Sequence, residues 1–269
     1  LQATELYADY LNSTSMTNHI INLVGSSAKK KKIDVAPYCY FQPNIIDYES
    51  KKGSKYDNEL KAAKYKVPMI DLTSDDDLKE YLVPAYKKIL PSNKSVCGLI
   101  GVPIPNEEDP EIDQDHYVSY IFNKQEDTLY YFDSAIDKDY KTNETYKILI
   151  FTFEPKKVVK NSKTFETAGG VSDSPYTYIA QNIFCHSWSL WFLYQIINED
   201  KTMRYINNLG SAKKSERDLE NLIRIKKFVY KKLIPLLELN VLFDFSLFDA
   251  FRYIIIKDNP EKYIEIIEE

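Results

Sequence analysis

The chain has 269 residues, of which 44% are hydrophobic and 28% are charged, and its formal net charge is -5. This length and apolar content suffice for one large or two small folded domains. The acidic balance argues against a nucleic-acid-binding protein that relies on bulk positive charge. The sequence therefore predicts no nucleic-acid partner. It also predicts no membrane partner, because no stretch reaches the roughly eighteen apolar residues of a membrane span.

The cysteines predict a reducing compartment. They form no C-x-x-C pair and no even-numbered disulfide framework, which is typical of a cytoplasmic protein. The three cysteines and three scattered histidines also lack zinc-ligand spacing, so we expect no metal site and no cofactor. The residues concerned are Cys39, Cys97 and Cys185, and His19, His116 and His186.

Two kinds of sequence occupy the first 66 residues. Thr4–Leu23 has apolar residues at weak helical spacing. Ser26–Lys66 is dominated by charged and turn residues and predicts a loop with minor structure around its apolar patch. We therefore predict an accessory N-terminal segment, residues 1–66, followed by the main domain, residues 67–269.

The main domain opens with a predicted helix and a predicted strand. Ser74 is followed by Asp75–Asp77, which together read as an N-cap and the acidic first turn of a helix that ends or kinks at Pro84. The aspartates are therefore interpreted as capping and solvation rather than as a metal site. Val96–Val102 is a short apolar run between turn residues and predicts a buried strand.

The next two apolar runs predict a hairpin. His116–Phe122 and Thr128–Phe132 are rich in β-branched and aromatic residues, and five polar residues separate them. A four-residue loop would place His116 opposite Asp133, and a five-residue loop would place Tyr117 there. In either register the carboxylate lies within reach of the imidazole.

Several further elements are expected downstream. Tyr146–Phe153 alternates weakly and predicts a strand, whereas the polar Lys156–Pro175, with two of the seven glycines, predicts a mobile loop. Ser215–Leu239 has helical spacing. Phe245–Ile256 and Pro260–Ile267 predict closing helices.

Cys185 stands directly before an apolar run that holds both tryptophans, Ser187–Ile197. The run is too long for a typical strand and apolar on all sides, so it predicts a buried central helix. Cys185 then falls at the helix N-terminus, where unpaired amides and the macrodipole favour a thiolate. The residue is interpreted as a nucleophile. An inert cysteine that fills space is the alternative.

A carboxylate that orients an imidazole toward a thiol is the arrangement of cysteine hydrolases. Asp133 would fix the tautomer of His116, which would take the thiol proton of Cys185 and later protonate the leaving amine. The alternative is a histidine that merely begins a strand and an aspartate in a turn. His19 is interpreted as incidental, and His186 as a poor base because adjacent residues on a helix do not face each other.

Four short motifs follow one another in an order that is characteristic of a protein superfamily. A strand that ends in Pro-Ile is followed by His116-Tyr117-Val118, by Tyr131-Phe132-Asp133-Ser134, and by Gln181 shortly before the Phe184–Leu190 stretch. This order resembles the adenain and SUMO-protease superfamily of cysteine proteases. The stretch around the cysteine looks most like the processing proteases of large DNA viruses, including the asfarvirus SUMO-like protease. The resemblance covers about residues 96 to 197.

The resemblance implies an α+β, papain-related fold in circularly permuted order. In that fold a mixed or antiparallel sheet packs on the buried helix that bears the nucleophile, with extra flanking helices. It also implies a catalytic set of His116, Asp133, Gln181 and Cys185. The Gln181 side chain would donate to the oxyanion beside the backbone amide of Cys185, with Asn182 as a competing donor.

Two aromatic residues are expected to contact substrate. Tyr117 stands where many relatives carry Trp and would line the narrow tunnel that, in relatives, admits Gly-Gly ahead of the scissile bond. Trp188 lies on the same helix as the nucleophile and is expected near that tunnel.

The leading hypothesis is a viral cysteine endopeptidase that cleaves polyproteins or ubiquitin-like substrates after small residues. An effector acyltransferase of the same superfamily, a deubiquitinase or deSUMOylase, and a catalytically silent protein-binding module stay open as alternatives. The expected partner is a protein substrate. A viral enzyme would act in the host cytoplasm or the virion, and any other in the cytoplasm.

Overall fold

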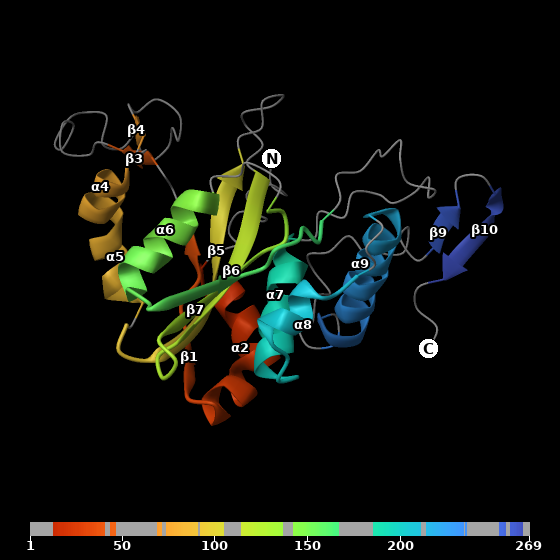
Figure 1. Ribbon diagram of the computed structural model, residues 1–269, viewed down its shortest axis with the longest axis horizontal. Helices are drawn as coiled ribbons and strands as arrows, with labels where there is room; N and C mark the ends of the chain where they lie inside the picture. Colours follow the sequence, from red (N-terminus) through yellow and green to blue (C-terminus); the bar gives the residue numbers. More distant parts are fainter. Residues whose placement is uncertain are drawn as a thin grey trace.

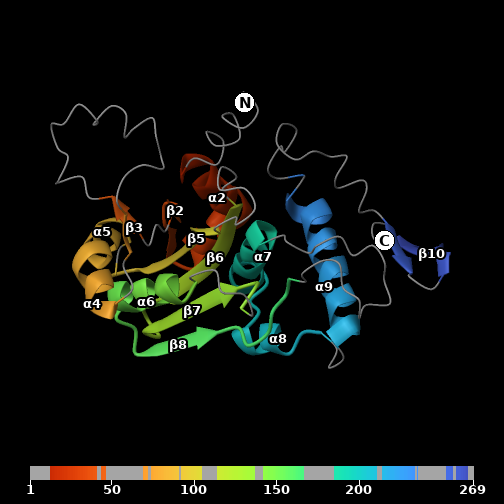
Figure 2. The ribbon, with the colours of Figure 1, turned by 90° about the horizontal axis from the view of Figure 1, so that it is seen from above.

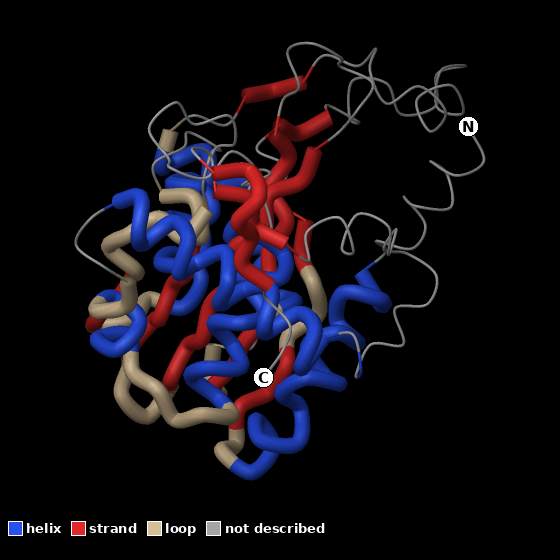
Figure 3. Tube along the Cα trace, turned by 90° about the vertical axis from the view of Figure 1, so that its right-hand side faces the viewer, coloured by secondary structure: helices blue, strands red, loops and turns tan. Residues whose placement is uncertain are grey.

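The computed structural model describes residues 13–40, 44–46, 69–71, 74–90, 92–104, 114–136, 142–166, 185–210, 214–233, 235, 253–256 and 259–265. Within these residues, six strands form one mixed sheet that lies between helices (Figure 1; Figure 3). None of the described helices is long and apolar enough to cross a membrane.

The sheet combines an antiparallel centre with parallel edges. Its strand order is β1 (Ile33–Val35), β5 (Ser95–Ile104), β6 (Gln114–Asn123), β7 (Thr128–Asp133) and β8 (Lys157–Lys160), and β2 (Cys39–Tyr40) also pairs with β5. The three central strands are antiparallel, whereas β1, β2 and β8 run parallel to their neighbours. Two further strand pairs are β3 (Asn44–Ile46) with β4 (Met69–Asp71), and β9 (Tyr253–Ile256) with β10 (Asn259–Glu265).

Helices cover both faces of the sheet because its strands are apolar on both sides. On one face lie α2 (Ser13–Lys30) and α7 (Cys185–Ile197), and on the other lie α4 (Asp75–Asp77), the π-helical turn η2 (Leu78–Leu82), α5 (Val83–Ile89) and α6 (Thr142–Phe153) (Figure 2). The chain continues through α8 (Met203–Asn207), α9 (Lys214–Phe228) and the π-helical turn η3 (Val229–Leu233). Leu99 and Phe132 point to the α7 face, and Ile100 and Tyr131 to the α6 face, as the two-residue period of a strand requires.

The predicted buried central helix is confirmed as α7. Apolar residues surround it: Trp188 is fully buried against Phe165 and Trp191, and Phe192 stacks on Phe132 with ring centroids 4.9 Å apart. Helix α2 packs beside α7, and β6 crosses beneath it. This helix therefore organises the larger of the two cores.

The expected loop with minor structure from Ser26 to Lys66 is wrong at its start, where a helix lies, whereas the short strand β2 falls in the predicted apolar patch. Helix α2 continues to Lys30, and β1 and β2 then pair with β5. The strands are too short to carry a pattern of their own, and they form because β5 offers unpaired backbone groups on that side. Residues 13–40 consequently share the core of the rest of the sheet.

The predicted strand Tyr146–Phe153 is also wrong, because this segment belongs to helix α6. Its buried side chains recur at intervals of three and four residues, the period of a helix. Two of them are threonines, which a count of apolar residues alone leaves out. The buried set is Thr145, Ile148, Leu149, Thr152 and Phe153.

Two other expectations are corrected. Strand β8 lies within the segment predicted as a loop from Lys156 to Pro175, since Lys157–Lys160 pairs with β7; the rest of that loop, beyond residue 166, falls outside the described residues. Strands β9 and β10 stand where the structure describes the predicted closing helices, and the β-branched run Ile254–Ile256 favours that outcome; the rest of those two segments falls outside the described residues.

We predict that Phe132→Ala lowers the free energy of unfolding by about 3–5 kcal/mol, because it empties a fully buried site against Phe165 and Phe192. Chemical denaturation measures the loss. The control, Ile21→Ala, changes a side chain that is 46% exposed on α2 and should stay within about 0.5 kcal/mol of the parent. Similar losses in the two variants would contradict the assigned core.

Candidate active site

The hairpin register differs from both predicted registers. Val118 pairs with Asp133, and Asn123 pairs with Thr128, so the loop contains the four residues 124–127. Asn123 therefore ends the strand rather than beginning the loop.

The turn itself explains this register. The Asn123 side-chain oxygen accepts hydrogen bonds from the backbone N–H groups of Gln125 and Glu126, at 3.0 and 3.3 Å. Asp127 closes the turn with a φ of 49°, a left-handed conformation that aspartate tolerates better than most residues. Local side-chain hydrogen bonding thus fixes the loop one residue later than the polarity of the sequence indicates.

His116 and Asp133 nevertheless meet. Asp133 lies opposite Val118, two residues from His116 and on the same side of the strand, so the two are diagonal neighbours. The His116 Nε2 atom donates to Asp133 Oδ1 at 2.7 Å. The side chains are 1% and 2% exposed, so water hardly competes for this hydrogen bond.

Asp133 is held by its own neighbours. Its Oδ1 atom also accepts from the backbone N–H of Ala135 at 2.8 Å. The buried Asn161 side chain accepts from the Asp133 N–H at 3.0 Å, and its Nδ2 donates to the carbonyl oxygens of Asp133 and Lys163 at 2.6 and 2.9 Å. Asn161, which follows β8, was missed in the sequence because β8 itself was not predicted.

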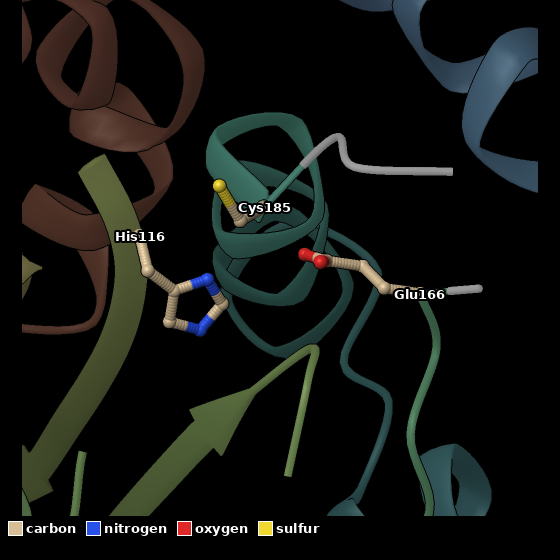
Figure 4. Close-up of side chains that lie close together, drawn as sticks. All are labelled: His116, Glu166 and Cys185. Carbon is tan, nitrogen blue, oxygen red and sulfur yellow. The ribbon is translucent and has the colours of Figure 1, made fainter. Parts of the chain in front are cut away.

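Cys185 is the first residue of α7, as the sequence predicts, and it lies beside His116 (Figure 4). The Ser189 hydroxyl, one turn later, donates to the Tyr117 carbonyl at 2.9 Å and so ties the helix to the strand that carries the histidine. The first turn of a helix is also the end at which its dipole favours negative charge.

The other two cysteines are poor nucleophiles. Burial raises the pKa of Cys39 to about 11 and, together with the charge of Asp34, raises the pKa of Cys97 to about 12. Both thiols are buried, whereas Cys185 is partly exposed. Exposure and position at a helix N-terminus therefore distinguish Cys185 from the others.

The charge balance around His116 favours its protonated form. Burial by itself lowers the pKa of this imidazole, but hydrogen bonds to Asp133 and Cys185 and the negative charges of both outweigh burial and raise the pKa to about 10. An imidazolium between a carboxylate and a thiolate is the ion pair of an activated cysteine.

His186 lies in a different environment. Its ring stands 5.3 Å from that of Tyr117 and 5.5 Å from that of His19, measured between centroids. Burial, with a smaller contribution from the charge of His19, lowers the pKa of His186 to about 3. The imidazole is therefore neutral at physiological pH and supplies no positive charge to Cys185.

Glu166 is a further carboxylate at the site that the sequence reasoning missed. It is buried and accepts a short hydrogen bond from the Ser134 hydroxyl, while its backbone N–H donates to the Ser134 carbonyl at 3.0 Å. One ligand atom each from His116, Glu166 and Cys185 lie within 4.8 Å of one another. His116 and Glu166 approach the start of α7 from opposite sides (Figure 4). Nothing in the polar segment around Glu166 singles it out.

The remaining predicted site residues are placed as follows. Gln181 and the alternative donor Asn182 lie outside the described residues. Tyr117 is 6% exposed and packs beside Tyr38 and His186. Trp188 lies in the core with none of its surface exposed, and its contact with substrate stays a prediction.

No protein-family model and no curated protein sequence matches the chain. Among solved structures, it is similar to ChlaDub1 from Chlamydia trachomatis, with 14% identity and a TM-score of 0.30 over 54% of this chain and 61% of that one. It is similar to the ASFV pS273R protease, with 10% identity and a TM-score of 0.31 over 75% and 64% of the two chains. A third similar structure is the Legionella pneumophila effector RavZ, with 12% identity and a TM-score of 0.24 over 82% and 70%.

The chain thus spans less than two thirds of the length of the first two structures. The likeness to these solved structures is a coarse one. The case for a function rests on the geometry of the site.

We predict that the His116 imidazole keeps its proton at neutral pH. A pKa raised above 6.5 means that the protonated form persists between pH 6.5 and about 10. Asp133→Asn and Cys185→Ala each remove a cause of the rise, so each should lower the pKa. Nitrogen chemical shifts of the labelled imidazoles across a pH titration measure it. Titration of His116 at or below 6.5 in the parent protein would contradict this electrostatic account.

We also predict that Asn161→Ala disturbs the site as well as the fold. It leaves buried backbone groups of Asp133 without their partner and should lower the free energy of unfolding by about 2–3 kcal/mol. The His116 pKa should fall too, because Asp133 loses its fixed position. Asn198→Ala removes a hydrogen bond to the Leu23 carbonyl and is the control, with no expected effect on His116. If the His116 pKa is the same in the two variants, Asn161 has only a structural role.

Proposed function

We propose that this protein is a cysteine peptidase whose nucleophile is Cys185. The observation that carries the proposal is the buried hydrogen bond of 2.7 Å from His116 to Asp133, with the other side of the imidazole against a thiol at a helix N-terminus. Nucleophile, base and orienting carboxylate come from α7, β6 and β7, so only the folded chain assembles them. The coarse likeness to cysteine-protease-like folds agrees with this chemistry.

The proposed reaction begins with the Cys185 thiolate. It attacks the carbonyl carbon of the scissile peptide bond, and the carbonyl oxygen becomes an oxyanion. The Cys185 backbone amide and the Gln181 side chain are proposed to stabilise that oxyanion. When the intermediate collapses, the carbon–nitrogen bond breaks and His116 gives its proton to the leaving amine. The product is a thioester on Cys185.

Hydrolysis of the thioester restores the enzyme. His116, now neutral, accepts a proton from water as the water attacks the acyl carbon. The carbon–sulfur bond then breaks, the new carboxyl terminus leaves, and the thiolate again faces an imidazolium. Asp133 holds the same imidazole tautomer in both halves of the reaction, because its hydrogen bond to Nε2 leaves Nδ1 for the reacting groups.

The finer parts of the proposal come from the resemblance of the motifs. The substrate is a protein, either a polyprotein or a ubiquitin-like protein, cleaved after Gly-Gly-type residues, and Tyr117 helps to bind it. A viral enzyme of this kind would act in the host cytoplasm or the virion, and any other in the cytoplasm. The division into residues 1–66 and 67–269 is also kept as a proposal, with the addition that α2 packs on α7 and so supports the site.

The test is cleavage of a peptide and of a ubiquitin-like precursor that carry Gly-Gly ahead of the scissile bond. Cys185→Ala should abolish cleavage, and His116→Ala should slow it by about a hundredfold or more. Cys39→Ala removes a thiol outside the site and is the matched control, with activity retained. Cleavage by Cys185→Ala at the parent rate would overturn the proposal.

A further inference from the structure

Glu166 has no role in the proposed peptidase mechanism, although its carboxylate lies inside the site. A carboxylate next to a thiolate and a developing oxyanion disfavours both negative charges. The chain nevertheless buries Glu166 there and fixes it through Ser134, by a side-chain and a backbone hydrogen bond. A divalent cation in place of the His116 proton would balance more of this negative charge than the proton does.

The three side chains offer the donor atoms that zinc prefers. Sulfur from Cys185, nitrogen from His116 and oxygen from Glu166 lie within 4.8 Å of one another. Zinc binds such ligands at about 2.0–2.3 Å in tetrahedral geometry, which sets neighbouring ligand atoms roughly 3.3–3.7 Å apart. Metal binding would therefore draw the three atoms together to that spacing. Magnesium and calcium, which prefer oxygen ligands, fit this set poorly.

The surroundings of the ligands match those of zinc sites as well. A metal-bound histidine usually donates its other ring N–H to a carboxylate, and His116 donates from Nε2 to Asp133 while Nδ1 turns toward Cys185 (Figure 4). Ligating carboxylates are themselves hydrogen-bonded, and Glu166 accepts from Ser134. These two hydrogen bonds are observations independent of the cluster itself.

We propose that His116, Glu166 and Cys185 form a reversible, inhibitory Zn²⁺ site, with the fourth position of the metal open to water. Zinc binding releases the proton of His116 Nδ1 to solvent, and the bound ion then occupies that nitrogen and the sulfur lone pair that attacks substrate. The ion is a regulator here and takes no part in the reaction. This inference rests on the proposed function for its inhibitory effect, but the binding site stands on geometry alone.

The spacing of ligands in the sequence predicts no zinc site, because each ligand comes from a different part of the fold. His116 lies on β6, Cys185 begins α7, and Glu166 follows β8 in the segment joined to Ser134. Sheet pairing and the packing of α7 bring them together.

The test is a titration of the metal-free, reduced full-length protein with Zn²⁺ by calorimetry, and with Co²⁺ to observe a thiolate-to-cobalt charge-transfer band. We expect one metal ion per chain and protection of Cys185 from iodoacetamide. Glu166→Gln keeps the acceptor for Ser134 and should weaken Zn²⁺ binding by about tenfold or more. Glu199→Gln makes the same change on an exposed residue beyond the other end of α7 and should bind like the parent.

Parent protein that binds no Zn²⁺, or that shows no thiolate band with Co²⁺, overturns the inference, as does a folded Glu166→Gln that binds like the parent. These binding results need no peptidase assay. If the metal-free protein cleaves substrate but does not bind Zn²⁺, the proposed function is supported and the metal site is refuted. If the protein binds Zn²⁺ through these residues but does not cleave substrate when metal-free, the metal site is supported and the proposed function is refuted.

Discussion

The site depends above all on the contact between helix α7 and strand β6. Cys185 begins the helix and His116 lies near the start of the strand, so any shift between the two elements separates the thiol from the imidazole. The contact is fixed at one point by the hydrogen bond from Ser189 to the Tyr117 carbonyl. It is fixed over a wider area by the aromatic core, in which Trp188 packs on Phe165. The apolar helix α7 thus positions the Cys185 thiol at its N-terminal end.

Burial makes the charged groups of the site unfavourable unless each has a hydrogen-bond partner. The His116 and Asp133 side chains lose nearly all contact with water, a loss that is unfavourable unless their hydrogen bonds are satisfied. The backbone of Ala135 and the side chain of Asn161 supply the support for Asp133. With that support, the carboxylate and the thiol together hold a proton on His116 that burial alone would remove.

The strongest patterns in the sequence predicted the central elements of the fold. The run after Cys185 is apolar on all sides and predicted a buried helix, and the two β-rich runs from His116 to Phe132 predicted a hairpin; the structure has both. Long-range pairing could not be predicted from local pattern, which is why β1, β2 and β8 were missed. Helix α6 was missed because Thr145 and Thr152 complete its buried face as polar residues.

The site was predictable to the same depth. His116 and Asp133 were predicted to meet because hairpin geometry limits their separation, and Cys185 was added because its chemistry is specific; the structure brings the three side chains together. The register was wrong because the Asn123 side chain sets the turn, yet diagonal neighbours on a strand pair are still within reach of an imidazole. Asn161 and Glu166 carry no local signal, since each reaches the site only through contacts between distant segments.

The most direct test of the central claim is the rate of Cys185 alkylation by iodoacetamide as a function of pH, in metal-free parent protein and in His116→Ala. An activated pair predicts that the parent is alkylated much faster than the variant near neutral pH, because His116 takes up the thiol proton. Profiles that coincide, or a thiol that stays unreactive in the folded parent, would contradict the assignment of Cys185 and His116 as nucleophile and base.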